Sequence, residues 1–384
     1  MQVRHFFAGT GNACVSGLTS TLVRGKRIMM KKCLSAFAAL LLGLSFSFGT
    51  QAKTLELSAT GTMYETHPVI AGTLLPWFEM MKEATGNKVT FEYFSPGTIC
   101  PVNEIYPSVA AGVVDLGISS LTMTPGRYPL WSVMELPLIF SSNSQFSVVS
   151  QLLYEKYPEL QKELKGLHPI ALFGSVPMQL VSKKPVKTFA DIKGLKVGAT
   201  TQGNIAPLAA FGASPVQIAP TDMYMALQRG MVDAVIWPIP SIMSFKFHEV
   251  AKYVTMLDLT AASSYFFINE DSWNNLPKDV QDVFLPTMGM RGTLSYSTCS
   301  DNSAIRDTET LKNAGVTFIT LPDEEKAKFV AAVKPLSENW LADMEKKGFA
   351  NIRAIYADML SIAAEYTPEK INALRQEVKP YNTK

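Results

Sequence analysis

One stretch of the sequence combines residue types that could bind an anion. Residues 195–199 (LKVGA) have the pattern of a strand, and Thr200-Thr201-Gln202-Gly203-Asn204 then lead into a helical pattern. Hydroxyl and amide groups at a helix N-terminus, just past the end of a strand, can donate hydrogen bonds to a carboxylate. The alternative is that a threonine or the asparagine only caps the helix. The pattern therefore predicts either an anion-binding loop or a plain helix start.

Motifs for catalysis or metal binding are missing from the sequence. It has no G-x-S-x-G turn, no H-E-x-x-H pair, no P-loop and no G-x-G-x-x-G after a strand. His67, His168 and His248 are not at metal-ligand spacing. His67 and His168 each precede a proline, where a structural role is the stronger expectation. We therefore expect no cofactor, no metal site and no enzymatic activity.

Composition and charge exclude two further classes. Lys plus Arg number 35 and Asp plus Glu number 33, so the net charge of +2 gives no reason to expect a nucleic-acid partner. A hydrophobic fraction of 47% with 18% charged residues is ample for a packed core and excludes a disordered chain. The length of 384 residues suggests two domains.

The first 52 residues differ from the rest of the chain. They contain basic residues but no acidic one, because the first acid is Glu56. Met30-Lys31-Lys32 precedes an apolar stretch over residues 33–48, and small residues follow up to Ala52. This pattern predicts a secretory signal peptide that is cleaved after Ala52, with translation starting at Met29 or Met30, and hence a secreted protein. A membrane anchor is the alternative, but the apolar stretch is shorter than the roughly 20 residues that a span needs.

Two cysteines remain after the predicted cleavage, Cys100 and Cys299. In an oxidising compartment such a pair either forms a disulfide or stays buried as two small apolar side chains. The sequence does not show whether the two Cα atoms approach each other, so both options stay open.

Strand patterns and helix patterns alternate from residue 53 to about residue 236, which predicts an α/β fold with parallel sheets flanked by helices. Residues 110–118 and 227–236 share the order helix end, glycine, apolar pair, aspartate and strand. This recurrence suggests two lobes of like topology, although the same connection is common in α/β proteins. We expect Asp115 and Asp233 to brace these connections. Long helical patterns follow over residues 278–314 and 323–347, and one of these helices could brace both lobes.

Several segments together resemble a known family. They are Asp191-Ile-Lys-Gly-Leu-Lys-Val, Gly212-Ala-Ser-Pro-Val, Tyr224-Met-Ala-Leu-Gln-Arg-Gly-Met-Val-Asp, His67-Pro68, Glu135-Leu-Pro-Leu-Ile-Phe and Trp273-Asn-Asn-Leu-Pro. In this order and spacing they resemble the solute-binding proteins of TRAP transporters, the DctP-type family. Each segment is weak alone, but the resemblance covers nearly all of residues 53–380.

The resemblance implies a two-lobed periplasmic binding protein with hinge-crossing strands and a long bridging helix. It would close on a small organic acid and deliver that acid to a membrane permease, the TRAP permease subunits being its partners. Residues 53–176 plus 264–310 would form lobe I, residues 177–263 plus 311–325 lobe II, and residues 326–384 the C-terminal helices.

Three positions depart from the pattern of the family. The arginine that usually grips the ligand carboxylate is replaced by Gly198, and a second basic position by Met178. The asparagine that usually precedes proline is Trp237, and because Ile236 stands where metal-binding members have glutamate, no metal is expected. A bidentate arginine–carboxylate contact is strong, so its loss implies another donor set or a less acidic ligand.

These departures predict a ligand with one carboxylate and an apolar or aromatic body. The expected binding residues are Tyr64, Ser119, Ser120, Arg127, Phe173, Met178, Thr200, Thr201, Asn204 and Trp237. Two alternatives stay open: Met178 and Trp237 could only line the core, and Arg127 could only hold a surface loop. An alternative function is a secreted sensor module that binds a small 2-oxo or dicarboxylic acid and presents its closed form to a receptor.

Overall fold

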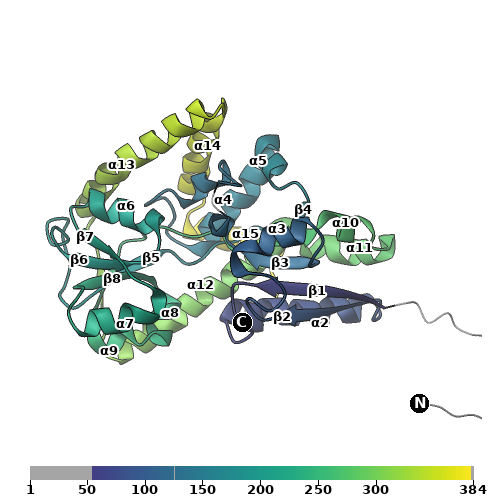
Figure 1. The fold of residues 1–384 in the computed structure, drawn as a ribbon, viewed down its shortest axis with the longest axis horizontal. Coiled ribbons are helices and arrows are strands. Elements are labelled where there is room, and N and C mark those ends of the chain that lie inside the picture. The colour runs from purple at the N-terminus through teal and green to yellow at the C-terminus, as the bar shows by residue number, and fades with distance from the viewer. Residues whose placement is uncertain (1–53, 125, 382–384) are drawn as a thin grey trace, which may run out of the picture. The chain divides into compact units, whose positions relative to one another are not determined.

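The structure is a computed structural model that describes residues 54–124 and 126–381. The predicted signal peptide and its cleavage site lie outside these residues. The described part contains a five-stranded and a six-stranded sheet, each covered by helices (Figure 1). We call each sheet with its helices a lobe. Within the described residues, none of the helices has the length and hydropathy needed to cross a membrane.

The elements have the following bounds. The five-stranded sheet contains β1 (Leu55–Gly61), β2 (Val89–Phe94), β3 (Leu116–Ser119), β4 (Leu167–Ala171) and β10 (Tyr265–Asn269). The six-stranded sheet contains β5 (Met178–Ser182), β6 (Lys196–Ala199), β7 (Ser214–Gln217), β8 (Ala234–Pro238), β9 (Tyr253–Met256) and β11 (Thr317–Thr320). The helices are α2 (Leu75–Ala84), α3 (Ile105–Ala110), α4 (Asn143–Lys156), α5 (Pro158–Glu163), α6 (Gln202–Ala210), α7 (Pro220–Gln228), α8 (Ile239–Ser244), α9 (Phe247–Val250), α10 (Glu270–Asn274), α11 (Lys278–Phe284), α12 (Gly289–Asn313), α13 (Asp323–Lys346), α14 (Ile352–Glu365) and α15 (Pro368–Val378). Short helical turns are η1 (Ile70–Leu74), η2 (Val102–Glu104), η3 (Leu121–Met123), η4 (Trp131–Glu135) and η5 (Leu285–Thr287).

The two lobes share one strand pattern. The five-stranded order is β2-β1-β3-β10-β4, and the six-stranded order, read from its other edge, is β7-β6-β8-β5-β9-β11. In each sheet three parallel strands are followed by a strand that the chain contributes as it crosses from the other lobe. The prediction of two lobes with like topology is confirmed.

The predicted parallel sheets are wrong at the two crossing strands. β10 runs antiparallel to β3 and β4, and β5 runs antiparallel to β8 and β9. The chain leaves β4 at the carboxyl edge of the first sheet and, after residues 172–177, enters the second sheet at its carboxyl edge. A strand that starts where its parallel neighbours end must run against them. The return through residues 257–264 into β10 has the same consequence.

The recurrent glycine and aspartate have the predicted roles. Gly112 and Gly230 end their helices with φ of 71° and 76°, a left-handed conformation that glycine adopts without strain. The Asp115 carboxylate accepts hydrogen bonds from the Ser58 backbone N–H at 2.9 Å and the Ser272 hydroxyl at 2.7 Å. The Asp233 carboxylate accepts one from the Lys196 N–H at 3.0 Å. Both aspartates therefore brace strands, which confirms the prediction.

Two long helices span both lobes. The first half of α12 packs in the five-stranded lobe, where the Thr293 hydroxyl accepts a hydrogen bond from the Leu172 N–H, and its last turns place Leu311 in the core of the six-stranded lobe. α13 likewise buries Phe329 in one lobe and Leu341 in the other. The predicted continuous helix over residues 278–314 is broken at η5, because Pro286 and the extended Met288 separate α11 from α12.

The close packing of α12 against the five-stranded lobe requires a glycine at position 292. A Cβ at Gly292 would lie 2.7 Å from the Thr287 carbonyl oxygen and 2.9 Å from that of Ile170. Both atoms belong to the backbone, so Gly292→Ala is expected to lower the free energy of unfolding by about 1–3 kcal/mol in urea titration, despite the better helix propensity of alanine. The matched control is Gly203→Ala in α6, where the nearest atom is 3.8 Å away and no loss is expected. Equal effects of the two changes would contradict the close packing.

The two cysteines are free and buried. Cys100 belongs to the core that includes Tyr106 and Trp131, whereas the Cys299 thiol lies 3.5 Å from the Pro68 carbonyl oxygen. Of the two options that the sequence left open, the structure has the buried thiols and not the disulfide.

Candidate functional site

The topology brings functional positions from both lobes to one place. β1, β3 and β4 run parallel in the first sheet and end at the same edge, as β6 and β8 do in the second. The crossing segments, residues 172–177 and 257–264, leave and enter the sheets at these edges. Ligands of open α/β sheets bind outside the carboxyl ends of the strands. The candidate site therefore lies between the lobes, beside the crossing segments.

A pocket occupies this place. We call it the interlobe pocket. It is lined after β1 by Met63, His67, Pro68 and Val69, on the crossing segments by Phe173, Gly174, Ser175, Val176 and Ser264, after β8 by Pro238, Pro240 and Ser241, and on α12 by Ser300 and Ser303. Its wall thus combines both lobes, the hinge and the bridging helix.

His67 is the titratable residue of this wall. Its Nδ1 accepts a hydrogen bond from the Val69 backbone N–H at 3.3 Å. Burial lowers the pKa of His67 below its ordinary value, and no neighbouring charge opposes this shift. The imidazole is therefore neutral near pH 7, with its proton on Nε2.

Phe173 is the predicted binding residue that lines the interlobe pocket. Its ring is buried and stacks on Tyr296 of α12, with ring centroids 4.9 Å apart. The Phe173 carbonyl oxygen accepts a hydrogen bond from the Ser264 N–H, which joins the two crossing segments. Tyr64 follows β1 in the loop that carries Met63 and His67, and its side chain is 65% exposed.

The predicted serines at the end of β3 belong to a buried polar cluster. Ser119 exchanges backbone hydrogen bonds with the Tyr106 hydroxyl, and the Ser120 hydroxyl bonds those of Thr122 and Ser263. The Glu135 carboxylate accepts a hydrogen bond from the Ser263 hydroxyl at 3.3 Å. Burial raises the pKa of Glu135 to about 7, although the surrounding hydroxyls oppose the rise. The cluster ties β3 to the second crossing segment.

Arg127 lies apart from these groups. Its side chain is exposed, and its guanidinium stands 5.9 Å from the ring centre of Tyr128 in the same loop. It does not line the interlobe pocket. An exposed side chain away from the pocket agrees with the alternative in which Arg127 only holds a surface loop.

In the second lobe, Thr200 and Thr201 connect β6 to α6, and the helix begins at Gln202, earlier than the predicted start after Asn204. Thr201 occupies the N-cap position, but its side chain makes no capping hydrogen bond. Asn204 is buried: its Oδ1 accepts from the Thr260 hydroxyl at 2.7 Å, and its Nδ2 lies 3.0 Å from the Met178 sulfur. The structure therefore brings Met178 and Asn204 together, beside the second crossing segment.

The position of the expected arginine is filled by another side chain. A Cβ at Gly198 would lie 2.5 Å from the Met223 sulfur and 3.3 Å from Cγ1 of Val235. Met223 belongs to α7, which packs on β6 and β8. The absence of the arginine is therefore accompanied by an apolar side chain in the space that its stem would need.

Trp237, on the same sheet, packs in this apolar group. Its ring meets Phe245 edge-on at 5.0 Å and Phe247 at 5.3 Å between centroids, and only 7% of the residue is exposed. Val235, two residues earlier on β8, points to the same face. The Met223, Val235 and Trp237 side chains belong to one buried apolar cluster in the core of the six-stranded lobe.

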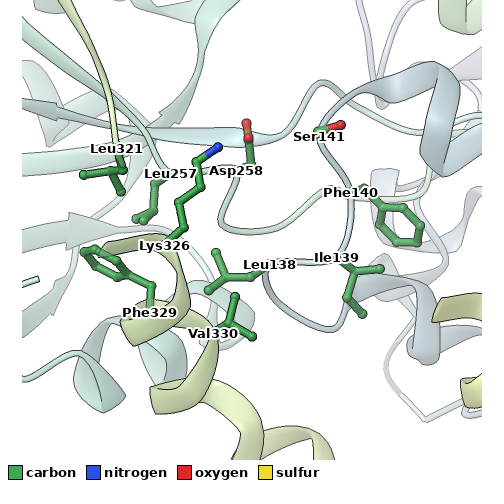
Figure 2. A pocket seen from close by; sticks show the side chains of 10 residues that line it. All are labelled: Leu138, Ile139, Phe140, Ser141, Leu257, Asp258, Leu321, Lys326, Phe329 and Val330. Atoms are coloured by element: carbon green, nitrogen blue, oxygen red, sulfur yellow. The ribbon is translucent and has the colours of Figure 1, made fainter. Parts of the chain in front are cut away.

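A second pocket lies on another part of the hinge. Figure 2 shows the amine of Lys326, on α13, directed toward the carboxylate of Asp258, above an apolar wall that includes Leu138 and Phe329. Asp258 has φ of 51° and accepts a hydrogen bond from Gln179 Nε2 at 2.7 Å. Burial raises the pKa of Asp258, while Gln179 and Lys326 oppose this. This pocket has no residue from the loop after β1, so it is not the site between the strand ends.

Sequence reasoning missed three features of the site. For His67 the sequence does contain a signal of function, because His67-Pro68 after the first strand is part of the resemblance to the family. Its place before a proline, however, favours a structural role. The serines of α12 had no signal, because a helix pattern does not say which face meets a pocket. Met223 had none either, since only the fold places it over Gly198.

Comparisons with known proteins agree with this architecture. Residues 60–344 match the DctP family, described as bacterial extracellular solute-binding protein, family 7. A TRAP periplasmic solute-binding protein from Desulfovibrio salexigens, in an open complex with the C-terminus of a symmetry mate in its ligand-binding site, has 26% identity and a TM-score of 0.76, over 81% of this chain and 96% of that chain.

Two further relatives show different ligands on this scaffold. A Bordetella bronchiseptica TRAP periplasmic solute-binding protein with bound (R)-mandelate and (S)-mandelate has 25% identity and a TM-score of 0.69, over 81% of this chain and 99% of that chain. The 2,3-diketo-L-gulonate-binding periplasmic protein YiaO of Escherichia coli has 24% identity over 244 residues, 63% of this chain and 74% of its own.

The two-lobed fold with crossing strands and bridging helices thus defines a periplasmic binding protein. The chain belongs to the DctP family of extracellular solute-binding proteins, the binding proteins of TRAP transporters. Members of this family bind solutes and are not enzymes, and the family is one of extracytoplasmic proteins.

Proposed function

We propose that this protein is the periplasmic binding subunit of a TRAP transporter for an organic acid with an apolar or aromatic body. It is secreted through a signal peptide that is cleaved after Ala52. Its lobes close on the acid between the ends of β1, β3, β6 and β8, and the closed form delivers the acid to the membrane permease subunits.

The observation that carries the ligand class is the filled space at Gly198. The Met223 sulfur lies 2.5 Å from the Cβ position, so an arginine there would first have to displace the end of this side chain. Val235 and Trp237 continue this buried apolar packing beside Gly198, so the second lobe offers no cation here and the acid depends more on contacts of its apolar body. Burying an aromatic ring of about 150–250 Å² contributes roughly 4–6 kcal/mol before the cost of closure, which offsets a weaker hold on the carboxylate.

The relatives are consistent with this class without fixing the ligand. The protein with bound mandelates carries a phenyl ring, a hydroxyl and a carboxylate in its ligands. YiaO is named for a sugar acid instead. The family scaffold therefore accommodates both classes, and the apolar packing at Gly198, in place of an arginine, favours the aromatic one for this chain.

Thermal unfolding with a panel of acids tests the proposal. Mandelate or benzoate at about 100 times its dissociation constant should stabilise the protein by ~2.7 kcal/mol, which raises Tm by on the order of 4 °C for a chain of this size. Succinate and glucuronate at the same concentration should raise the Tm by clearly less. Stabilisation by succinate or glucuronate alone would overturn the proposed ligand class. Benzyl alcohol, which keeps the ring and lacks the carboxylate, is the control for non-specific binding of an aromatic ring.

A further inference from the structure

We infer that His67 is the anion-binding residue of this protein: its Nε2–H, with the hydroxyls of Ser300 and Ser303, binds the carboxylate of the ligand in the interlobe pocket. This rests on the proposed function, since it names how the same site holds its acid. It replaces a fixed guanidinium on the second lobe with a neutral imidazole on the first.

The hydrogen bonds of His67 fix which nitrogen is available. Nδ1 accepts from the Val69 N–H, so the ring proton is on Nε2. Within the described residues Nε2 has no hydrogen-bond partner, and the ring lines the interlobe pocket. Because a neutral imidazole donates from one nitrogen only, Nε2–H is the donor that His67 offers to a ligand.

The remaining donors come from the bridging helix and from both lobes. Ser300 and Ser303 lie one turn apart on α12, on the face that lines the pocket, and Ser241 lines the pocket from α8 of the second lobe. Hydroxyls donate to a carboxylate without adding charge. An anion held by His67, Ser241 and Ser300 would contact both lobes and α12 at once, which is what a ligand that stabilises closure must do.

No charged side chain among the described residues in the wall of the interlobe pocket would repel an anion bound at His67. His67 is the one titratable residue that lines the interlobe pocket. Its own loop carries Tyr64 and Glu65, the Tyr93 hydroxyl of β2 donates to the Met63 carbonyl, and Cys299 of α12 lies against Pro68. Glu65 acts on Tyr93 and is not among the causes of the shift at His67. A ligand carboxylate would therefore be the first negative charge beside this ring.

This arrangement couples binding to protonation. Burial lowers the pKa of His67 in the free protein, and a bound carboxylate raises it again. The complex then takes up a proton on Nδ1, which gives up its hydrogen bond from the Val69 N–H, at pH values between the two pKa values. Affinity should rise as the pH falls from above the higher pKa and level off below the lower one. An arginine, which stays charged throughout, would give no such dependence.

Isothermal titration calorimetry with mandelate, between pH 5 and 8 and in two buffers of different ionisation enthalpy, tests the inference. The wild type should take up a fraction of a proton on binding. His67→Asn keeps an acceptor for the Val69 N–H but removes the Nε2 donor, and should bind roughly 10- to 100-fold more weakly with no proton uptake. His67→Gln places an N–H near the Nε2 position and should recover most of the affinity, still without uptake.

His168→Asn is the matched control. His168 also has a pKa lowered by burial, but it stacks on Trp273 and lies outside the interlobe pocket. This variant should leave both affinity and proton uptake as in the wild type. Circular dichroism and Tm of each variant establish that it is folded before titration.

The outcomes separate this inference from the proposed function. Wild-type affinity and proton uptake in His67→Asn would overturn the inference and leave the ligand class untouched. If mandelate does not bind, succinate is titrated instead. Succinate binding with a proton uptake that depends on His67 would support the inference while overturning the aromatic ligand class. If neither acid binds the wild type, both fail.

Discussion

Replacing Gly198 with arginine is expected to destabilise the six-stranded lobe rather than to create an anion clamp. The new Cβ would lie 2.5 Å from the Met223 sulfur, and the stem would enter the buried apolar cluster that contains Val235 and Trp237. A charge buried there without a partner costs about 3–5 kcal/mol. Urea unfolding of Gly198→Arg should show this loss, and succinate should not raise its Tm.

Removing Met223 at the same time should reverse part of the loss. Met223→Ala alone leaves a cavity and is expected to cost about 2–5 kcal/mol. In the double variant the arginine stem occupies that cavity. The double variant should therefore lose much less unfolding free energy than the sum of the losses in the two single variants. The double variant should also gain stabilisation by succinate or glucuronate relative to mandelate. Strict additivity of the two unfolding free energies would show that Met223 does not occupy the place of the arginine.

Trp77→Ala should have the largest effect on stability away from the site. Trp77 is fully buried on α2, meets the rings of Phe266 and Phe284 edge-on at 5.6 and 5.3 Å, and donates from Nε1 to the Thr287 hydroxyl at 3.0 Å. Truncation of such a side chain costs about 3–5 kcal/mol. The urea midpoint should fall accordingly.

The matched variant is Trp77→Phe, which keeps a ring among the same neighbours and loses the Nε1 hydrogen bond. Thr287 still donates to the Phe284 carbonyl oxygen at 2.7 Å, so its hydroxyl is not left without a partner. The loss should therefore be less than half of that in Trp77→Ala. A phenylalanine variant as unstable as the alanine variant would show that the Nε1 bond, and not the burial of the ring, dominates.

Local patterns in the sequence were enough for the elements and their local ties. Glycine at a helix end followed by an apolar pair and aspartate predicted both the left-handed turn at Gly112 and the bracing role of Asp115, because these depend on residues close in the chain. The same patterns, in their order, identified the family. They predicted a helix after the strand at residues 195–199 but placed its start after Asn204, whereas α6 already begins at Gln202.

The tertiary structure alone decided the direction of the crossing strands and the chemistry of the pocket. β5 and β10 are antiparallel because the chain enters each sheet from the cleft, which no local pattern records. Met223 lies over Gly198, and Ser300 and Ser303 line the same pocket as His67, through contacts between segments far apart in the chain. A sequence specifies such contacts only through the whole fold, since each depends on how a helix packs on a sheet formed elsewhere.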